Sequence, residues 1–449
     1  MTSKNIFIIS IALEQIIFLY FVFFSYPILG ARLLQLIIIV FYLFTKPHIF
    51  KIKLDSGNQI YSYLFIFLLL GLIVSYINLF LGNYQTSFFQ EVLNNSTINM
   101  SIKTAMREIA VYIYFIFIFI FLLNRIIKSA DDLILFFRVY RVIFLISLYA
   151  GLVTLLIEFV NGYNYNIIPR QLNYIENGAT FIGARFHGFF GEPRDAMVCL
   201  SIGLLILTLE QILLVNLKKI TVFNKFFYIN IILIFTSFYL TDSGSALIAI
   251  ILFLIIAPIY LFQTTLRNLK YIFLIATIIF CASLFINSPR FLNYMSEIYL
   301  FELFNINYLV NSEYLKYQLN NILPIILFIE NMINIDVIPS MFGNGFASTA
   351  FVSYEGYASS YEETFNYPHS QITRIIFENG IIGIVLWFLI FFSSVYSLKK
   401  LINKKYYNYI CLIFLFSFCA ALAHRNPQMF LILGILISFK HNISRNFIK

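Results

Sequence analysis

The stretch NQIYSYLFIFLLLGLIVSYINLFLG, residues 58–82, contains no charged side chain and is apolar over almost its whole length. A helix of this length crosses the roughly 30 Å hydrocarbon core of a bilayer, because each residue adds about 1.5 Å. Similar runs recur through the 449-residue chain, in which 61% of residues are hydrophobic and 11% are charged. Soluble domains carry roughly a quarter charged residues. The sequence therefore predicts an all-α membrane protein, a polytopic helical bundle, and excludes a soluble enzyme.

Apolar runs bounded by charged or polar residues predict about twelve membrane-spanning helices of about 20 residues each. The predicted spans lie near residues 5–24, 27–45, 58–82, 107–124, 140–160, 195–215, 226–241, 244–262, 271–287, 376–398, 406–423 and 427–440. The chain then divides into three parts. Residues 1–287 hold the first nine spans, residues 288–375 form a large external loop, and residues 376–449 hold the last three spans.

The basic residues decide the orientation of the spans, because lysine and arginine in short loops remain in the cytoplasm. Lys4 and the basic residues of the short loops all fall on one side, which places both termini in the cytoplasm. Three long segments then face outward, at residues 83–106, 161–194 and 288–375. The net charge of +9 is scattered between apolar runs, so it indicates membrane topology and no nucleic-acid partner.

Two kinds of site are not indicated by the sequence. No run of the form GxxxxGK[ST], which binds nucleotide phosphates, is present, and the four cysteines lie inside apolar runs without CxxC spacing. We therefore expect neither a disulfide framework nor a zinc site. We also expect substrates that are already energised or that move down a gradient, rather than ATP-driven chemistry.

The most informative polar stretch is FIGARFHGFFGEPRDAMVCLS, residues 181–201, at the predicted outer mouth of the sixth span. It contains Arg185, His187, Glu192 and Arg194. Two guanidinium groups can bind phosphate oxygens bidentately, and the interleaved glycines let backbone approach a ligand closely. We interpret the stretch as a site for an anionic, lipid-linked head group. The alternative is a pair of arginines that reach the phosphates of ordinary membrane lipids.

A second polar stretch, NYPHSQITRIIFENGIIG, covers residues 366–383 and enters the tenth predicted span. Ser370 stands where a helix N-cap is expected, and His369 is a candidate general base near neutral pH. Arg374 and Glu378 are one helical turn apart and can pair. The alternative for His369 is an ordinary residue of the membrane interface.

Weaker signals are the hairpin TDSGSALIA at residues 241–249 and the turn MFGNGFAST at residues 341–349, both predicted to be external. The turn contains Gly343 and Gly345. Three carboxylates lie within or near spans. Glu14 is expected to pair with Arg32, whereas Glu158 and Glu210 lie near span ends, where exposure at the membrane interface is expected.

The order of four elements resembles the O-antigen polymerase and ligase superfamily. They are GARFHGFFGEPRDAM entering a mid-chain span, the hairpin TDSGSA, the turn GNGF, and HSQITRIIFENGIIG entering a later span. Length and layout look most like a Wzy-type polymerase of bacterial surface polysaccharide. One position departs from the pattern, because Gly244 follows Ser243 where many relatives carry an arginine.

The resemblance implies a fold related to the GT-C glycosyltransferases, in the bacterial cytoplasmic (inner) membrane with the active site on the periplasmic face. The implied donor is an undecaprenyl-diphosphate-linked glycan, and the acceptor is a sugar hydroxyl of a second lipid-linked repeat unit. Catalytic roles carry over to His369 and Glu192, and substrate binding to Arg185, Arg194, Arg374, His187, Gly343 and Gly345. No DxD cluster lies in the outward segments, so we expect neither a metal nor a cofactor. A regulator of chain length is a further candidate partner.

Two other functions remain open at this stage. An O-antigen ligase, which moves a finished glycan to lipid A core or protein, would share the fold, the donor and the histidine. A polysaccharide flippase or other transporter would carry charged residues deep within several spans, whereas here they crowd at the outer mouth. The polymerase fits the layout of this chain best.

The topology can be tested by cysteine labelling in intact spheroplasts. Cysteines introduced at positions between 300 and 360 should react with a membrane-impermeant maleimide, and those at positions 400–405 should react only after permeabilisation, because the flanking loops are basic. The reverse labelling pattern would contradict the predicted orientation.

Overall fold

The computed structural model describes part of the chain. These described residues are 3–16, 30–47, 59–81, 102–160, 185–191, 193–220, 223–241, 243, 245–246, 249–250, 252–253, 324–325, 328–329, 331–334, 337–346, 348–349, 370–399, 401–423 and 428–447. They are predominantly α-helical, and no β-strand occurs among them.

The helices follow one another along the chain with short connections where these are described. Their bounds are α1 Ser3–Leu13, α3 Gly30–Thr45, α4 Gln59–Leu81, α6 Ile102–Phe115, the π-helix η3 Ile116–Leu122, α7 Leu123–Ile126, α8 Ala130–Val160, the 3-10 helix η4 Gly188–Phe190, α10 Pro193–Asn216, α11 Lys225–Leu240, α17 Val337–Phe342, α18 Gln371–Tyr396, α19 Lys404–Ala423 and α20 Met429–Phe447.

The prediction of a helical membrane protein is confirmed at the level of its helices. Six described helices are long and apolar enough to cross a membrane, and four shorter ones are also apolar. Each of them overlaps one of the predicted spans. The predicted span at 271–287, and all but a few positions of the span at 244–262, lie outside the described residues.

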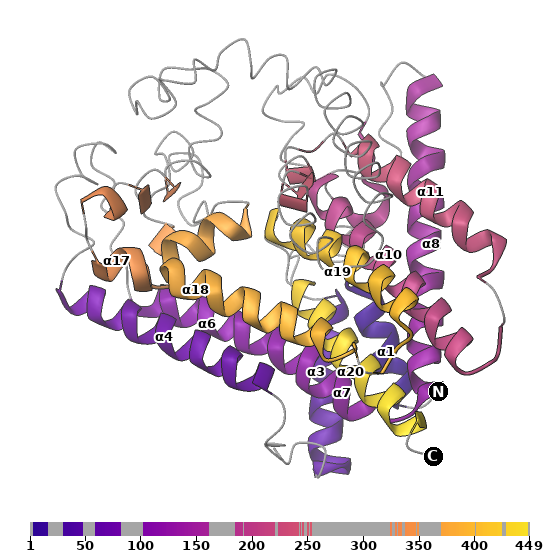
Figure 1. Ribbon diagram of the computed structural model, residues 1–449, viewed down its shortest axis with the longest axis horizontal. Helices are drawn as coiled ribbons and strands as arrows, with labels where there is room; N and C mark the ends of the chain where they lie inside the picture. Colours follow the sequence, from indigo (N-terminus) through magenta and orange to yellow (C-terminus); the bar gives the residue numbers. More distant parts are fainter. Residues whose placement is uncertain are drawn as a thin grey trace.

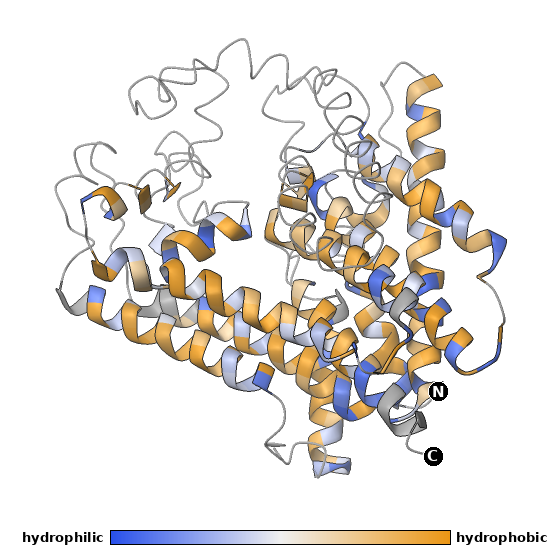
Figure 2. Cartoon of the chain, viewed as in Figure 1, coloured by the Kyte–Doolittle hydropathy of each residue, from blue (hydrophilic) through white to orange (hydrophobic). Residues whose placement is uncertain are grey.

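Helix α10 is the most enclosed of the long helices. Of the 18 consecutive residues with the highest hydropathy in α10, 89% are buried, whereas only 28% of the corresponding residues in α8 are buried. The reason is that α8, α11 and α19 all pack against α10. Figure 1 shows α4, α6 and α18 running together across the lower part of the view, with α8 and α11 at the right. Apolar residues cover the outward surfaces of these helices, and polar residues gather towards their ends (Figure 2). That distribution suits helices that face lipid.

Three of the four cysteines can be placed in this bundle. Cys199, Cys411 and Cys419 are free and buried. They act as small apolar side chains of the core, as the sequence predicted. Cys281 lies outside the described residues.

Helix α8 begins at Ala130, so it contains the predicted span at 140–160 and extends about ten residues before it. Asp131 and Asp132 stand in its first turn, where carboxylates are favourable at the positive end of the helix dipole. Lys4 pairs with Asp132, and Lys219 Nζ lies 3.2 Å from Asp131 Oδ1. These pairs bring together the ends of α1, α8 and α10 that the basic loops assign to the cytoplasm.

The three carboxylates predicted to lie within or near spans, Glu14, Glu158 and Glu210, are all buried, and the prediction holds for only one of them. Arg32 Nε lies 3.8 Å from Glu14 Oε1, so this expected pair is confirmed. Glu210 is buried instead of exposed, because Arg141 of the adjacent α8 approaches it to 2.9 Å and supplies the opposite charge. Glu158 is buried as well. The predicted interface exposure is therefore wrong for both Glu158 and Glu210.

The turn GNGF packs into the bundle. We call residues 343–346 together with Ser348 and Thr349 the docking turn. Phe346 is fully buried, and its ring centroid lies 5.6 Å from that of Phe67 and 5.4 Å from that of Tyr112. Gly71 of α4 makes room for this ring, since a Cβ there would come within 2.6 Å of Phe346 Cζ. The docking turn is thus fixed to α4 and α6 by an aromatic side chain.

We expect Gly71→Val to destabilise the protein by about 1–3 kcal/mol, because the new side chain overlaps the Phe346 ring. Thermal unfolding in detergent measures the loss. Leu69→Val, on the exposed face of the same helix, is the matched control and should change stability little. Adding Phe346→Leu to Gly71→Val should restore part of the loss. Equal effects of Gly71→Val and Leu69→Val would show that Phe346 does not dock at this position.

Candidate functional site

The docking turn fits against a kink in α18. Gly343, Gly345 and Gly380 all have positive φ angles, of 77°, 90° and 61°, which glycine adopts without steric cost. The backbone N–H of Asn344 donates to the carbonyl of Phe377 at 2.9 Å, and that of Gly345 donates to the carbonyl of Glu378 at 2.8 Å. Two elements that are far apart in the sequence, GNGF and ENG, therefore form one structural unit.

Helix α4 completes the seat of the docking turn. The Ser75 hydroxyl accepts from the backbone N–H of Phe346 at 2.7 Å. The Asn78 side chain donates to the carbonyl of Asn344 at 3.0 Å. These bonds satisfy polar backbone groups that would otherwise be costly between apolar helices.

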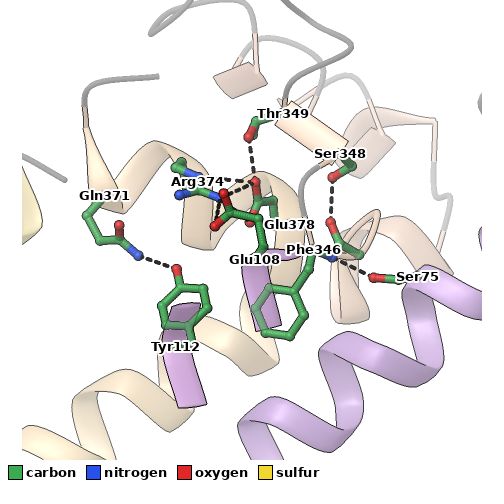
Figure 3. A network of polar contacts seen from close by, with 10 residues as sticks. Ser75, Glu108, Tyr112, Phe346, Ser348, Thr349, Gln371, Arg374 and Glu378 are labelled. Atoms are coloured by element: carbon green, nitrogen blue, oxygen red, sulfur yellow. Dashed lines mark hydrogen bonds and ion pairs between the residues drawn. The ribbon is translucent and has the colours of Figure 1, made fainter. Parts of the chain in front are cut away.

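Arg374 lies at the centre of a buried ion-pair network (Figure 3). Its Nε and Nη2 donate to Glu378 Oε1 at 3.2 and 3.1 Å, which confirms the expected pair within α18. Nη2 also lies 3.2 Å from Glu108 Oε2 of α6. The Thr349 hydroxyl donates to Glu378 Oε1 from the docking turn. The plane of the guanidinium is thus held by acceptors from two helices.

Helix α6 supplies two residues of this network that the sequence analysis did not single out. Glu108 bonds to Arg374, and the hydroxyl of Tyr112, one turn later, accepts from Gln371 Nε2 at 2.9 Å. Both are buried on the same side of α6, facing α18. The available signal was a carboxylate at the start of an apolar run, which is rare without a partner.

A second polar cluster forms around the element GARFHGFFG. Arg185 Nε donates to the carbonyl of Thr241 at 3.0 Å, and the N–H of Phe186 donates to the carbonyl of Leu240 at 2.8 Å. Thr241 is the C-cap of α11, where a cation is favoured by the helix dipole. The structure therefore joins the first two motif elements, the Arg185 stretch and the TDSGSA hairpin.

Two further candidates from this stretch are described, His187 directly before η4 and Arg194 in the first turn of α10. His187 is buried, and its Nδ1 lies 3.0 Å from the carbonyl oxygen of Gly188. The N–H of Phe189 donates to the Ser147 hydroxyl of α8 at 3.1 Å. Arg194 is half-buried in the first turn of α10. Glu192 and His369 lie outside the described residues.

Ser370 occupies the N-cap position of α18, as predicted, but its side chain makes no capping hydrogen bond. The start of α18 is held instead by side chains from α6 and the docking turn. In Figure 1 the docking turn, next to α17, is at the left of the view, and α8 and α11, which bond Phe189 and Arg185 respectively, are at the right. Those sequence-predicted residues that the structure describes thus lie in two clusters on different elements.

No protein-family model matches this chain, and no curated protein matches it. Within the part of the chain that the structure describes, no three His, Cys, Asp or Glu side chains are grouped as metal ligands. The chemistry available in the two clusters is that of guanidinium groups, carboxylates, an imidazole and hydroxyls. Such groups bind anions and sugar hydroxyls and transfer protons.

We expect Arg374→Leu to lower the free energy of unfolding by about 3–5 kcal/mol, because it leaves two buried carboxylates without their cation. Lys219→Leu is the control, since Lys219 is 49% exposed and its partner Asp131 is 86% exposed. This change should cost about 1 kcal/mol or less. Thermal unfolding in detergent compares them, and similar losses would mean that the Arg374 network does not stabilise the bundle.

Proposed function

We propose that this protein is a Wzy-type polysaccharide polymerase that joins lipid-diphosphate-linked repeat units by glycosyl transfer. The supporting observation is the fit between the turn GNGF and the kinked helix that carries Arg374, Glu378 and Gly380. These residues belong to the last two of the four ordered elements on which the resemblance rests. The third and fourth elements, GNGF and HSQITRIIFENGIIG, thus share one site. The first two elements, GARFHGFFGEPRDAM and TDSGSA, share another around Arg185.

The proposed reaction is a substitution at the anomeric carbon of the donor glycan. A sugar hydroxyl of the acceptor unit forms a bond to this carbon, and the bond from the carbon to the diphosphate oxygen breaks. The hydroxyl proton passes to a base of the protein. The lipid diphosphate leaves with the bonding electrons, so its added negative charge needs stabilisation.

Residues of this chain can supply both roles. Arg185 and Arg194, both half-buried near the start of α10, are suited to bind diphosphate oxygens. His369 is the proposed proton acceptor, with Glu192 as the next candidate. Arg374 is buried and already pairs with two carboxylates, so its proposed contribution is to hold α18 in place.

The proposal includes the finer architecture expected from the sequence. It places about twelve spanning helices of GT-C type in the bacterial cytoplasmic membrane, with both termini inside and the residues 288–375 outside. The large outward segments would then meet lipid-linked substrates at the periplasmic face. The donor brings its own energised bond, so no nucleotide is required.

A reconstituted reaction tests the function. The purified protein in liposomes receives lipid-linked repeat units, with and without chelator, and products are separated as a ladder. Wild type should form chains in both conditions. His369→Ala should slow chain growth by about 10²–10⁴-fold, as expected for loss of general-base assistance. Arg185→Lys should also reduce it, since lysine lacks the bidentate fork.

The control variant is His441→Ala, because His441 is an exposed residue near the end of α20. It should polymerise like wild type. Activity that requires a divalent ion, or that survives His369→Ala, would assign the proton acceptor elsewhere. Transfer of a finished glycan to lipid A core without chain growth would identify a ligase, and absence of any transfer would overturn the proposal.

A further inference from the structure

Helix α6 meets the start of α18 through two polar contacts one turn apart. Glu108 Oε2 accepts from Arg374 Nη2 at 3.2 Å, and the Tyr112 hydroxyl accepts from Gln371 Nε2 at 2.9 Å. All four side chains are buried (Figure 3). Residues four apart on a helix lie on one face, so Glu108 and Tyr112 both point from α6 towards the first turns of α18.

The docking turn also holds α18, slightly further along the helix. Thr349 of the docking turn donates to Glu378, and the backbone of the docking turn bonds to the carbonyls of Phe377 and Glu378. The first turns of α18 are therefore held jointly by α6 and the docking turn, which also contact each other through Tyr112 and Phe346. This restraint replaces the capping bond that Ser370 does not make.

We infer that Glu108 and Tyr112 are positioning residues for the first two turns of α18. This part of the helix carries Arg374 and begins two residues after His369 in the chain. The inference rests on the proposed function for its kinetic consequence. Neither Glu108 nor Tyr112 needs to touch the substrate, because both act through the side chains of α18 that they hold.

Tyr114 provides a matched control on the same helix. Its hydroxyl donates to Gln35 Oε1 of α3 at 2.8 Å, so it also bonds a buried glutamine. Two positions along a helix turn the side chain by about 200°. Tyr112→Phe and Tyr114→Phe therefore remove the same chemical group from α6, but only the first loses a bond to α18.

The first measurement is kinetic, in the liposome reaction with lipid-linked repeat units. Tyr112→Phe and Glu108→Gln should each lower kcat by about tenfold, as expected when a bond that orients a reacting group is lost. The KM for the donor should stay within about twofold, because its binding groups are unchanged. Tyr114→Phe should keep the wild-type kcat.

A double-mutant cycle adds a readout that general destabilisation would not give. Combining Tyr112→Phe with Gln371→Leu should lower kcat no further than either change alone, because both remove the same bond. Additive losses would overturn the inference. So would equal kcat losses in Tyr112→Phe and Tyr114→Phe, or a fall in activity that is entirely a rise in KM.

The second measurement does not depend on activity. Amide hydrogen exchange of the purified protein should be faster over the first two turns of α18 in Tyr112→Phe and Glu108→Gln than in wild type and Tyr114→Phe. Unchanged exchange there would overturn the positioning role even if the protein polymerises. If wild type joins no repeat units, the proposed function fails, and the exchange experiment still decides the role of α6.

Discussion

The ion pairs of Arg374 determine how one end of the bundle is assembled. A guanidinium buried between apolar helices is costly unless counter-charges and hydrogen-bond acceptors meet it there. Glu378 comes from the same helix and Glu108 from α6, while Thr349 reaches Glu378 from the docking turn. Three segments that are distant in the sequence must therefore converge on one charge. The kink at Gly380 and the left-handed glycines of the docking turn give the backbone the shape that this convergence needs.

The two polar clusters suit different tasks. Around Arg374 the charges are already paired and the side chains are enclosed, which favours rigidity. Around Arg185 the guanidinium lies at a helix end and is only half-buried. A transferase for lipid-linked substrates needs both properties, because a reacting group must be held still while a charged head group enters and leaves. The division of the motif residues into two clusters is consistent with that requirement.

The sequence predicted individual elements better than their partners. The spans follow from apolar length alone, and the Arg374–Glu378 pair follows from spacing within one helix. Helix α8 extends back to Ala130, beyond the predicted span, and its first turn is held by the pairs of Asp131 with Lys219 and of Asp132 with Lys4. Glu210 was expected at the interface because it lies near a span end, and its partner Arg141, on another helix, could not be seen from local spacing.

What the sequence by itself determined is the class of protein, the positions of its helices and the residues that carry polar chemistry, since these depend on composition and local spacing. Only the tertiary structure decided which polar residues meet. Glu108 and Tyr112 stand in an apolar run with no motif around them, and their role becomes visible when α6 lies against α18. The burial of Phe346 beside Gly71 is of the same kind. Contacts between distant segments depend on how helices pack in three dimensions, and no local pattern in one chain encodes them.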